Sequence, residues 1–505
     1  MSVQQLRDRL ANADKATVAV AAFYLALCLI WTGLLATKIT DRQLNPDAAQ
    51  NVRMASHVAH YWFFSFDRYE PPKHPTMERE PIPVFALAAW ILINPELSNV
   101  RPYQEFGQGR TLVSLKKINL FWAFFLHFGM CVLIFSSSSN LMWRLVVPPF
   151  IIVMTNLTFL NEYVDKLLTQ LPAGCFLAWG TACMLLFVQR PTRRRAVILG
   201  ISLALLALTK AVFFYVSLGA IIVLSIQMYT RREAFETRSP LPSFRILRGR
   251  RGFPILGFVL LSFLGVIGIW VVRNAIELHQ FRIADRGGDV LYMRVLTMQK
   301  PVLGGLYAYA PRAYQPWIGK MTGYQRKDIK SGGRLADLSA KNPEEDIRKK
   351  RWKIYKVEME KAGVKFRGRN KAQGWLAREG LKRYVSDPVA LVGWIPVYAM
   401  RGSFFLFDEL TNKAIYMHLT VLLILNFLVV SFVSLFRSRI ETCAVFLLPL
   451  GLYLFHAMFT HGLARYNEPM VPFVWLALVY TVSYLGNLVA RSWREHREQP
   501  ISARP

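Results

Sequence analysis

Acidic residues are scarce in this 505-residue chain, which has 32 Asp and Glu residues against 62 Lys and Arg residues. The sequence contains no Asp-x-Asp pair and no glycine-rich phosphate loop ending in Lys, the patterns that hold a metal-bound diphosphate or a nucleotide. The connections predicted to lie in the cytoplasm are also too short to form a separate domain. These absences exclude a cytoplasmic nucleotide-binding domain.

Cysteine is also rare. All five cysteines fall within apolar runs and show no metal-ligand spacing: Cys28, Cys131, Cys175, Cys183 and Cys443. They predict no disulfide bond, and they leave the redox compartment undetermined.

Long apolar runs, in contrast, are abundant. Hydrophobic residues make up 53% of the chain, and the mean hydropathy is +0.26. Runs of about 20 residues match the roughly 30 Å hydrocarbon core of a bilayer. The sequence therefore predicts an all-α polytopic membrane protein with about ten spans, at residues 17–37, 118–136, 145–160, 170–188, 196–211, 212–229, 252–272, 416–436, 442–460 and 470–489.

The net charge of +30 is concentrated between the spans. Basic clusters precede the first span and recur at residues 190–195, 231–251, 437–439 and after 491. Holding these clusters inside predicts that both termini are cytoplasmic and that the protein contacts anionic membrane lipids. No nucleic-acid partner is expected, because such a surface would interleave basic residues with exposed aromatics on one folded domain.

Two long segments, 38–117 and 273–414, then lie on the extracytoplasmic side. The apolar stretch 81–93 is too short to span and predicts an interfacial helix, while residues 324–383 predict a charged helical insert. We divide the chain into a membrane core with its first outer loop (1–272), an outer segment with the insert (273–414), and C-terminal membrane helices with a cytoplasmic tail (415–505).

The motif Asn45-Pro46-Asp47 predicts the start of a helix in the first outer loop. Asn is a favoured N-cap, Pro suits the first helical position, and Asp47 in the first turn faces unpaired amides that favour an ionised carboxylate. Taken alone, the motif indicates an ordinary helix start.

Further charged motifs reach the same outer face. Arg79-Glu80-Pro81 precedes the short apolar helix, and residues 161–165, which include Glu162 and Asp165, lie at the turn after the third span. Carboxylates at this depth need a polar cavity or cations beside them. The cluster predicts a site in which one carboxylate acts as general base while Arg or Lys holds a phosphate.

The ordered motifs resemble the integral-membrane glycosyltransferases of the GT-C class, specifically the bacterial relatives of protein O-mannosyltransferases and the lipid A aminoarabinose transferase. The resemblance covers most of the chain. It rests on Asn45-Pro46-Asp47 after the first span, residues 79–83, the turn with Glu162, residues 200–210, residues 270–274 and residues 465–469 before the last span.

This resemblance implies an inverting transferase in a bacterial inner membrane. Its donor would be a polyprenyl-phosphate sugar, and its extracytoplasmic acceptor a glycolipid, polysaccharide or protein. The implied catalytic residues are Asp47, as base or metal-contacting acid, and Glu162. Glu80 is added to them from the charged cluster at the outer face. The implied substrate-binding residues are Arg79, Lys210, Arg273, Asp165, Arg465 and Tyr466.

Some questions stay open at this stage. Family members often have an acidic pair in the first loop, whereas Ala48 follows Asp47 here, so no metal ligands are assigned and a divalent metal is only a possible cofactor. His57, His60 and His74 match no zinc spacing. A transporter or lipid flippase is an alternative, although the sequence shows no internal repeat, and a non-catalytic envelope-assembly subunit is another.

Overall fold

The computed structural model describes residues 15–68, 70–101, 103–230, 253–285, 287–312, 314–338, 345–366, 369–403, 414–436, 440–460 and 463–498. These residues form helices and connecting segments, with no strand among them. The predicted all-α class is confirmed. The basic clusters before residue 15, at 231–251 and at 437–439 lie outside the described residues.

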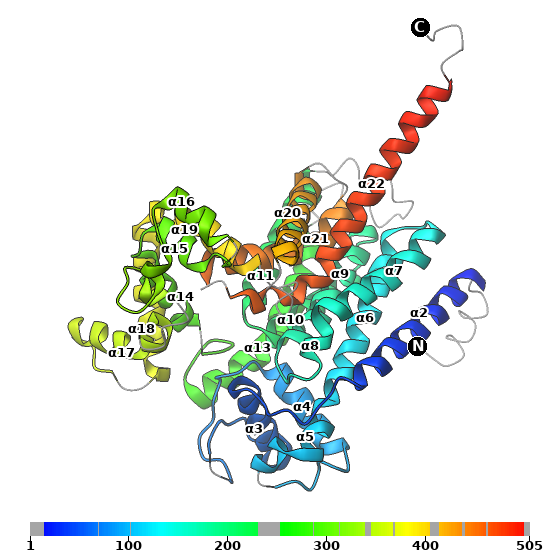
Figure 1. Cartoon of the computed structure of the whole chain (residues 1–505). Helices are drawn as coiled ribbons and strands as arrows, with labels where there is room; N and C mark the ends of the chain where they lie inside the picture. The colour runs from blue at the N-terminus through cyan, green and yellow to red at the C-terminus, as the bar shows by residue number, and fades with distance from the viewer. Residues whose placement is uncertain are drawn as a thin grey trace.

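A bundle of long apolar helices forms the body of the protein (Figure 1). Within the described ranges, nine helical stretches are long and apolar enough to cross a membrane. They contain α2 (Lys15–Ala36), α6 (Ile118–Ser137), α7 (Leu141–Thr155), α9 (Gln170–Gln189), α11 (Val212–Thr230), α13 (Phe253–Leu278), α20 (Ala414–Phe436), α21 (Ile440–Phe459) and α22 (Val471–Glu498).

The remaining predicted span is the shorter helix α10 (Arg193–Thr209), which has 17 residues and packs against α9, α11 and α13. A Cβ atom added to Gly200 would lie 2.0 Å from Ser262 Oγ and 2.4 Å from the Val259 carbonyl oxygen of α13. Only glycine therefore allows this approach between the two helices, as small residues do in membrane helix pairs. Thr209 ends α10 and Val212 begins α11, so the predicted break at Lys210 is confirmed.

The first long loop folds into helices at one end of the bundle: α3 (Pro46–Tyr61), α4 (Pro81–Ile93), η1 (Tyr103–Gly107) and α5 (Gly109–Lys116). Asn45 caps α3, because its Oδ1 accepts a hydrogen bond of 2.9 Å from the Ala48 amide. Helix α4 matches the predicted short apolar helix, and it packs against α3. A short π-helical turn, η2 (Asn156–Leu160), and α8 (Asn161–Tyr163) form the next outer turn.

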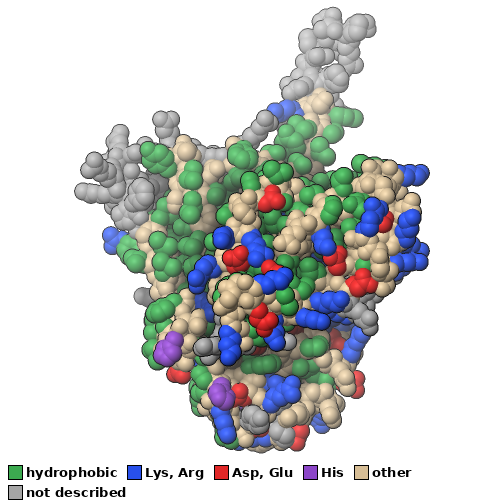
Figure 2. Space-filling view, turned by 90° about the vertical axis from the view of Figure 1, so that its left-hand side faces the viewer, with side chains coloured by type: hydrophobic (Ala, Val, Ile, Leu, Met, Phe, Trp, Pro, Cys, Tyr) green, Lys and Arg blue, Asp and Glu red, His purple; other side chains and the backbone are tan. Residues whose placement is uncertain are grey.

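A second group of helices, which we call the side subdomain, occupies residues 287–403 and projects from one flank of the bundle (Figure 1). Its elements are α14 (Gly287–Met298), α15 (Val302–Tyr309), α16 (Gln315–Thr322), η4 (Arg326–Ile329), η5 (Ala336–Leu338), α17 (Ile347–Lys361), α18 (Arg369–Ser386) and α19 (Pro388–Ser403). The described part of the predicted insert is helical. Figure 2 looks at this flank and shows Lys and Arg side chains gathered over it, with fewer Asp and Glu side chains among them.

Candidate active site

Asp47 lies at the centre of the candidate site, in the first turn of α3. Arg79 Nη2 donates a hydrogen bond of 2.8 Å to its Oδ1, and Arg465 Nη2 lies 3.4 Å from its Oδ2. The Asp47 side chain keeps 32% of its surface exposed. The carboxylate is thus fixed by two cations from distant parts of the chain, yet it can still be reached from outside.

Arg79 joins the two helices of the first loop. Its side chain is only 8% exposed, and its Nη2 also donates to Gln50 Oε1 at 2.5 Å and to the Asp47 carbonyl at 3.2 Å. Arg79 immediately precedes Glu80, the N-cap residue of α4, so these contacts align the start of α4 with the start of α3. Arg79 therefore positions Asp47 rather than lying free for a ligand.

Lys210 lies between α10 and α11, outside the candidate membrane spans. Its Nζ is 3.4 Å from the Tyr466 carbonyl oxygen and 5.1 Å from the centre of the Tyr466 ring. Burial lowers the pKa of Lys210 to about 8, although the charges of Glu80 and Glu468 oppose that shift. Glu80 Oε1 also accepts a hydrogen bond of 3.3 Å from the amide of Ala211.

The segment before α22 supplies the next wall of the site, through η6 (Ala464–Tyr466) and η7 (Glu468–Met470). Tyr466 stacks on His456, with ring centres 5.1 Å apart. Arg465 lies 5.8 Å from the centre of the same Tyr466 ring. The predicted residues Asp47, Arg79, Glu80, Lys210, Arg465 and Tyr466 thus come together.

Glu468 and Tyr163 belong to this group but were not selected from the sequence. The Tyr163 hydroxyl donates a hydrogen bond to the Glu468 side chain, and the charges of Glu162 and Arg465 also act on Tyr163. Glu162 itself pairs with Lys166, one helical turn away. Tyr163 therefore links the predicted acid Glu162 to the Arg465 side of the site. Glu468 lies in the motif of residues 465–469, only three positions after Arg465. That spacing was the feature of the sequence that could have identified it as a site residue.

Asp165 braces the chain instead of facing Asp47. Its Oδ1 accepts hydrogen bonds from Lys116 Nζ at 2.8 Å and from the Thr40 amide at 2.7 Å. Lys116 is fully buried and also donates to the carbonyl oxygens of Thr40 and Arg42, both at 2.8 Å. This network holds the segment that leads into α3. A role for Asp165 in substrate binding stays a prediction.

Arg273 is likewise occupied by contacts with the first loop. Its Nη1 donates to the Thr76 carbonyl at 2.9 Å, and its guanidinium lies 5.5 Å from the centre of the Phe64 ring. It also lies over Trp270, at 5.1 Å. Within the described ranges these contacts join Arg273 to the first loop and to its own helix, and its predicted role in phosphate binding stays a prediction.

In the part of the chain that the structure describes, no three His, Cys, Asp or Glu side chains meet as a metal site would require. Asp47 contacts two arginines, while His57 Nδ1 lies 3.1 Å from the Ser65 carbonyl oxygen. Participation of a divalent metal stays a prediction for experiment.

No protein-family model and no curated protein sequence matches the chain. Among solved structures, the archaeal oligosaccharyltransferase AglB from Archaeoglobus fulgidus, in complex with an inhibitory peptide and a dolichol-phosphate, is similar with a TM-score of 0.45 and 12% identity; the match covers 96% of this chain. This chain spans about half of AglB, 52% of its length. ArnT from Cupriavidus metallidurans bound to undecaprenyl phosphate is similar with a TM-score of 0.35 and 14% identity, over 90% of this chain and 77% of ArnT. The apo structure of the same ArnT is similar with a TM-score of 0.32 and 15% identity. That match covers 91% of this chain and 78% of ArnT.

Proposed function

We propose that the protein is an inverting membrane glycosyltransferase. It transfers a sugar from a polyprenyl-phosphate donor to a hydroxyl group of an acceptor on the extracytoplasmic side. The observation that carries the proposal is the placement of Asp47, a partly exposed carboxylate, beside Arg465 and close to the Lys210 and Tyr466 pair. These four residues all belong to the sequence motifs that resemble the GT-C class.

Asp47 acts as the general base in this reaction. Its Oδ2 faces Arg465 at 3.4 Å, a loose contact that an acceptor hydroxyl can replace or share. The acceptor hydroxyl gives its proton to Asp47 while its oxygen attacks the anomeric carbon. Because Arg79 holds Oδ1 at 2.8 Å, the base is fixed before the acceptor arrives.

The bond from the anomeric carbon to the phosphate oxygen breaks as the new glycosidic bond forms. The electron pair moves to the phosphate, which gains negative charge. Lys210 and Arg465 stabilise that charge, since both cations lie around the Tyr466 ring. Attack from the face opposite the phosphate inverts the anomeric configuration.

The side of the membrane follows from the predicted charge distribution. The candidate site is built from the first long loop, the α10–α11 turn and the segment before α22. In the sequence, the basic clusters predicted to be cytoplasmic adjoin the opposite ends of the predicted spans. The donor's polyprenyl chain would remain in the bilayer, and its phosphate would reach Lys210 at the surface.

The decisive experiment measures sugar transfer from a panel of radiolabelled polyprenyl-phosphate sugars to acceptors in membrane extracts. The purified protein is compared with the Asp47→Asn variant and with Asp41→Asn, an exposed aspartate of the same loop. We expect transfer by the parent and by Asp41→Asn, and a loss of about 100-fold or more in Asp47→Asn. Equal transfer by Asp47→Asn removes the proposed base, and no transfer by the parent rejects the proposed enzyme.

A further inference from the structure

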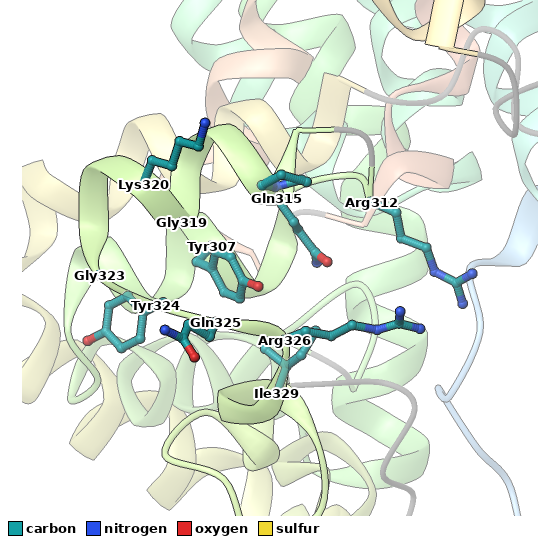
Figure 3. Close-up of a pocket in the computed structure, with 11 residues that line it drawn as sticks. Tyr307, Arg312, Gln315, Gly319, Lys320, Gly323, Tyr324, Gln325, Arg326 and Ile329 are labelled. Carbon is teal, nitrogen blue, oxygen red and sulfur yellow. The ribbon is translucent and has the colours of Figure 1, made fainter.

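A pocket of about 560 Å³ opens in the side subdomain, between α15, α16 and η4 (Figure 3). Its lining includes Arg312, Lys320 and Arg326 but no carboxylate. The lining also includes Gln315, Gln325 and two tyrosines. The pocket is therefore concave, positively charged and rich in hydrogen-bonding groups, and the proposed transfer reaction does not use any of these residues.

The two arginines are placed to act together. Figure 3 shows Arg312 and Arg326 extending toward the same side of the pocket, with the polar ends of Gln315 and Tyr307 directed into the space beside them. Both arginines are exposed, and neither forms an ion pair with another described residue. Their planar guanidinium groups suit two-point hydrogen bonding to a phosphate or carboxylate.

Asp328, which belongs to η4 beside the pocket, is paired with a different arginine. Asp328 Oδ1 accepts a hydrogen bond of 2.8 Å from Arg334 Nε, and its Oδ2 accepts one of 2.7 Å from the Gln325 amide. Asp328 is only 4% exposed. Since its carboxylate is already satisfied by these donors, the positive charge of Arg312 and Arg326 remains available to a ligand.

The floor of the pocket is closely packed. Tyr307 is 3% exposed, and its ring stacks on Tyr324 with centres 6.2 Å apart. A Cβ atom on Gly319 would lie 2.6 Å from the Tyr324 carbonyl oxygen, so α16 and the following turn are in close contact. Gly323 provides that turn with a φ of +76°, a conformation that favours glycine. These contacts define the floor of the pocket between α15, α16 and the turn that follows α16.

We propose that this pocket binds an anionic saccharide, that is, a sugar unit carrying a phosphate or carboxylate group. The volume falls within the roughly 300–1,000 Å³ of small-molecule sites. Arg312 and Arg326 hold the anionic group. Gln315 Nε2 donates to the Ala310 carbonyl oxygen at 3.2 Å, so Gln315 Oε1 and the Tyr307 hydroxyl bond to sugar hydroxyls. Free acidic sugars and acidic glycans linked to a lipid or polymer present the same chemistry.

Binding is measured by isothermal titration of the full-length protein in detergent, independently of any transfer activity. The probes are glucuronate, glucose 6-phosphate, neutral glucose and inorganic phosphate. We expect the two acidic sugars to bind, and Arg312→Gln and Arg326→Gln each to weaken binding about tenfold or more. Arg378→Gln removes an exposed charge from α18 and should leave binding unchanged. Tyr307→Phe should weaken binding of glucose 6-phosphate but not of inorganic phosphate.

Several results would overturn the assignment. These are equally tight binding of neutral glucose, equal weakening by Arg378→Gln, inorganic phosphate binding as tightly as glucose 6-phosphate, or no acidic sugar bound at roughly 10 mM. A further arm presents the same acidic sugar on a lipid in mixed micelles. Tighter binding there assigns the pocket to lipid-linked glycans and equal binding assigns it to soluble ones; both support the saccharide site.

Discussion

Arg79 reaches across 32 residues of chain to donate a hydrogen bond of 2.8 Å to the carboxylate of Asp47. The same nitrogen contacts Gln50, so one nearly buried guanidinium joins the start of α3 to the segment that leads into α4. The relationship explains why two motifs that look ordinary on their own lie at one site.

Replacing Arg79 with Gln should reduce transfer about 10- to 100-fold, because Asp47 would lose its alignment. Initial rates of Arg79→Gln, Asp47→Asn and the double variant test this dependence. The double variant should be little worse than Asp47→Asn alone, since Arg79 acts through Asp47. Fully additive losses would show that Arg79 contributes separately.

Transfer should fall as the pH rises through about 8. Burial lowers the pKa of Lys210 to about 8, so the ammonium that stabilises the leaving phosphate is lost above that pH. Lys210→Arg should keep substantial transfer at pH 9, because arginine remains charged. A profile that Lys210→Arg leaves unchanged would assign the titration to another group.

The lowered pKa of Lys210 has the opposite effect on the pH dependence of stability: as the pH rises, transfer falls but the contribution of Lys210 to stability increases. The Lys210 pKa in the folded protein lies below its ordinary value of 10.5, so the unfolded chain binds more protons between about pH 8 and 10.5. The contribution of Lys210 to stability therefore improves as the pH rises through this window. Thermal unfolding at each pH distinguishes loss of activity by titration from loss by denaturation.

Asp165→Asn should destabilise the protein by roughly 3 kcal/mol, because it leaves the buried Lys116 ammonium without its carboxylate. Chemical unfolding in detergent measures the change. The paired variant Lys116→Met with Asp165→Asn should recover part of the loss. If Asp165→Asn abolishes transfer at full stability, Asp165 has a direct role at the site.

Gly200→Ala should destabilise the bundle by about 1–3 kcal/mol, because the added methyl group meets the backbone of α13. Gly265→Ala is the matched control, since a Cβ atom at Gly265 has open space around it. Comparison of their unfolding midpoints tests the helix contact. Similar midpoints would mean that α10 and α13 separate without penalty.

The sequence was most informative where local chemistry decides the structure. The Asn45 cap and the prolines at positions 46 and 81 set the starts of α3 and α4, and the polar step at Lys210 set the α10–α11 break. Contacts between distant segments could not be read in this way. The role of Asp165 depends on Lys116, 49 residues away, because only tertiary packing shows which cation a carboxylate meets.

Contacts between distant segments also explain why some site residues could not be assigned from the sequence. Glu468 lay within a quoted motif, but its hydrogen bond from Tyr163 depends on η7 and α8 meeting in space. Arg273 was expected near a phosphate because it is a cation at a span end, whereas its guanidinium contacts backbone carbonyls of the first loop. The charge of each residue was evident from the sequence, whereas the partner that it meets was not.

The shortness of α10 also has a consequence for the shape of the bilayer. Its 17 residues extend only about 25 Å, less than the roughly 30 Å thickness of the hydrocarbon core. A span shorter than the hydrocarbon core is accommodated where the bilayer thins around it, which would keep the α10–α11 turn and Lys210 at the polar surface. Thinning there would bring lipid headgroups and water to the turn, so a polar acceptor would descend to the donor phosphate while the polyprenyl chain stays immersed.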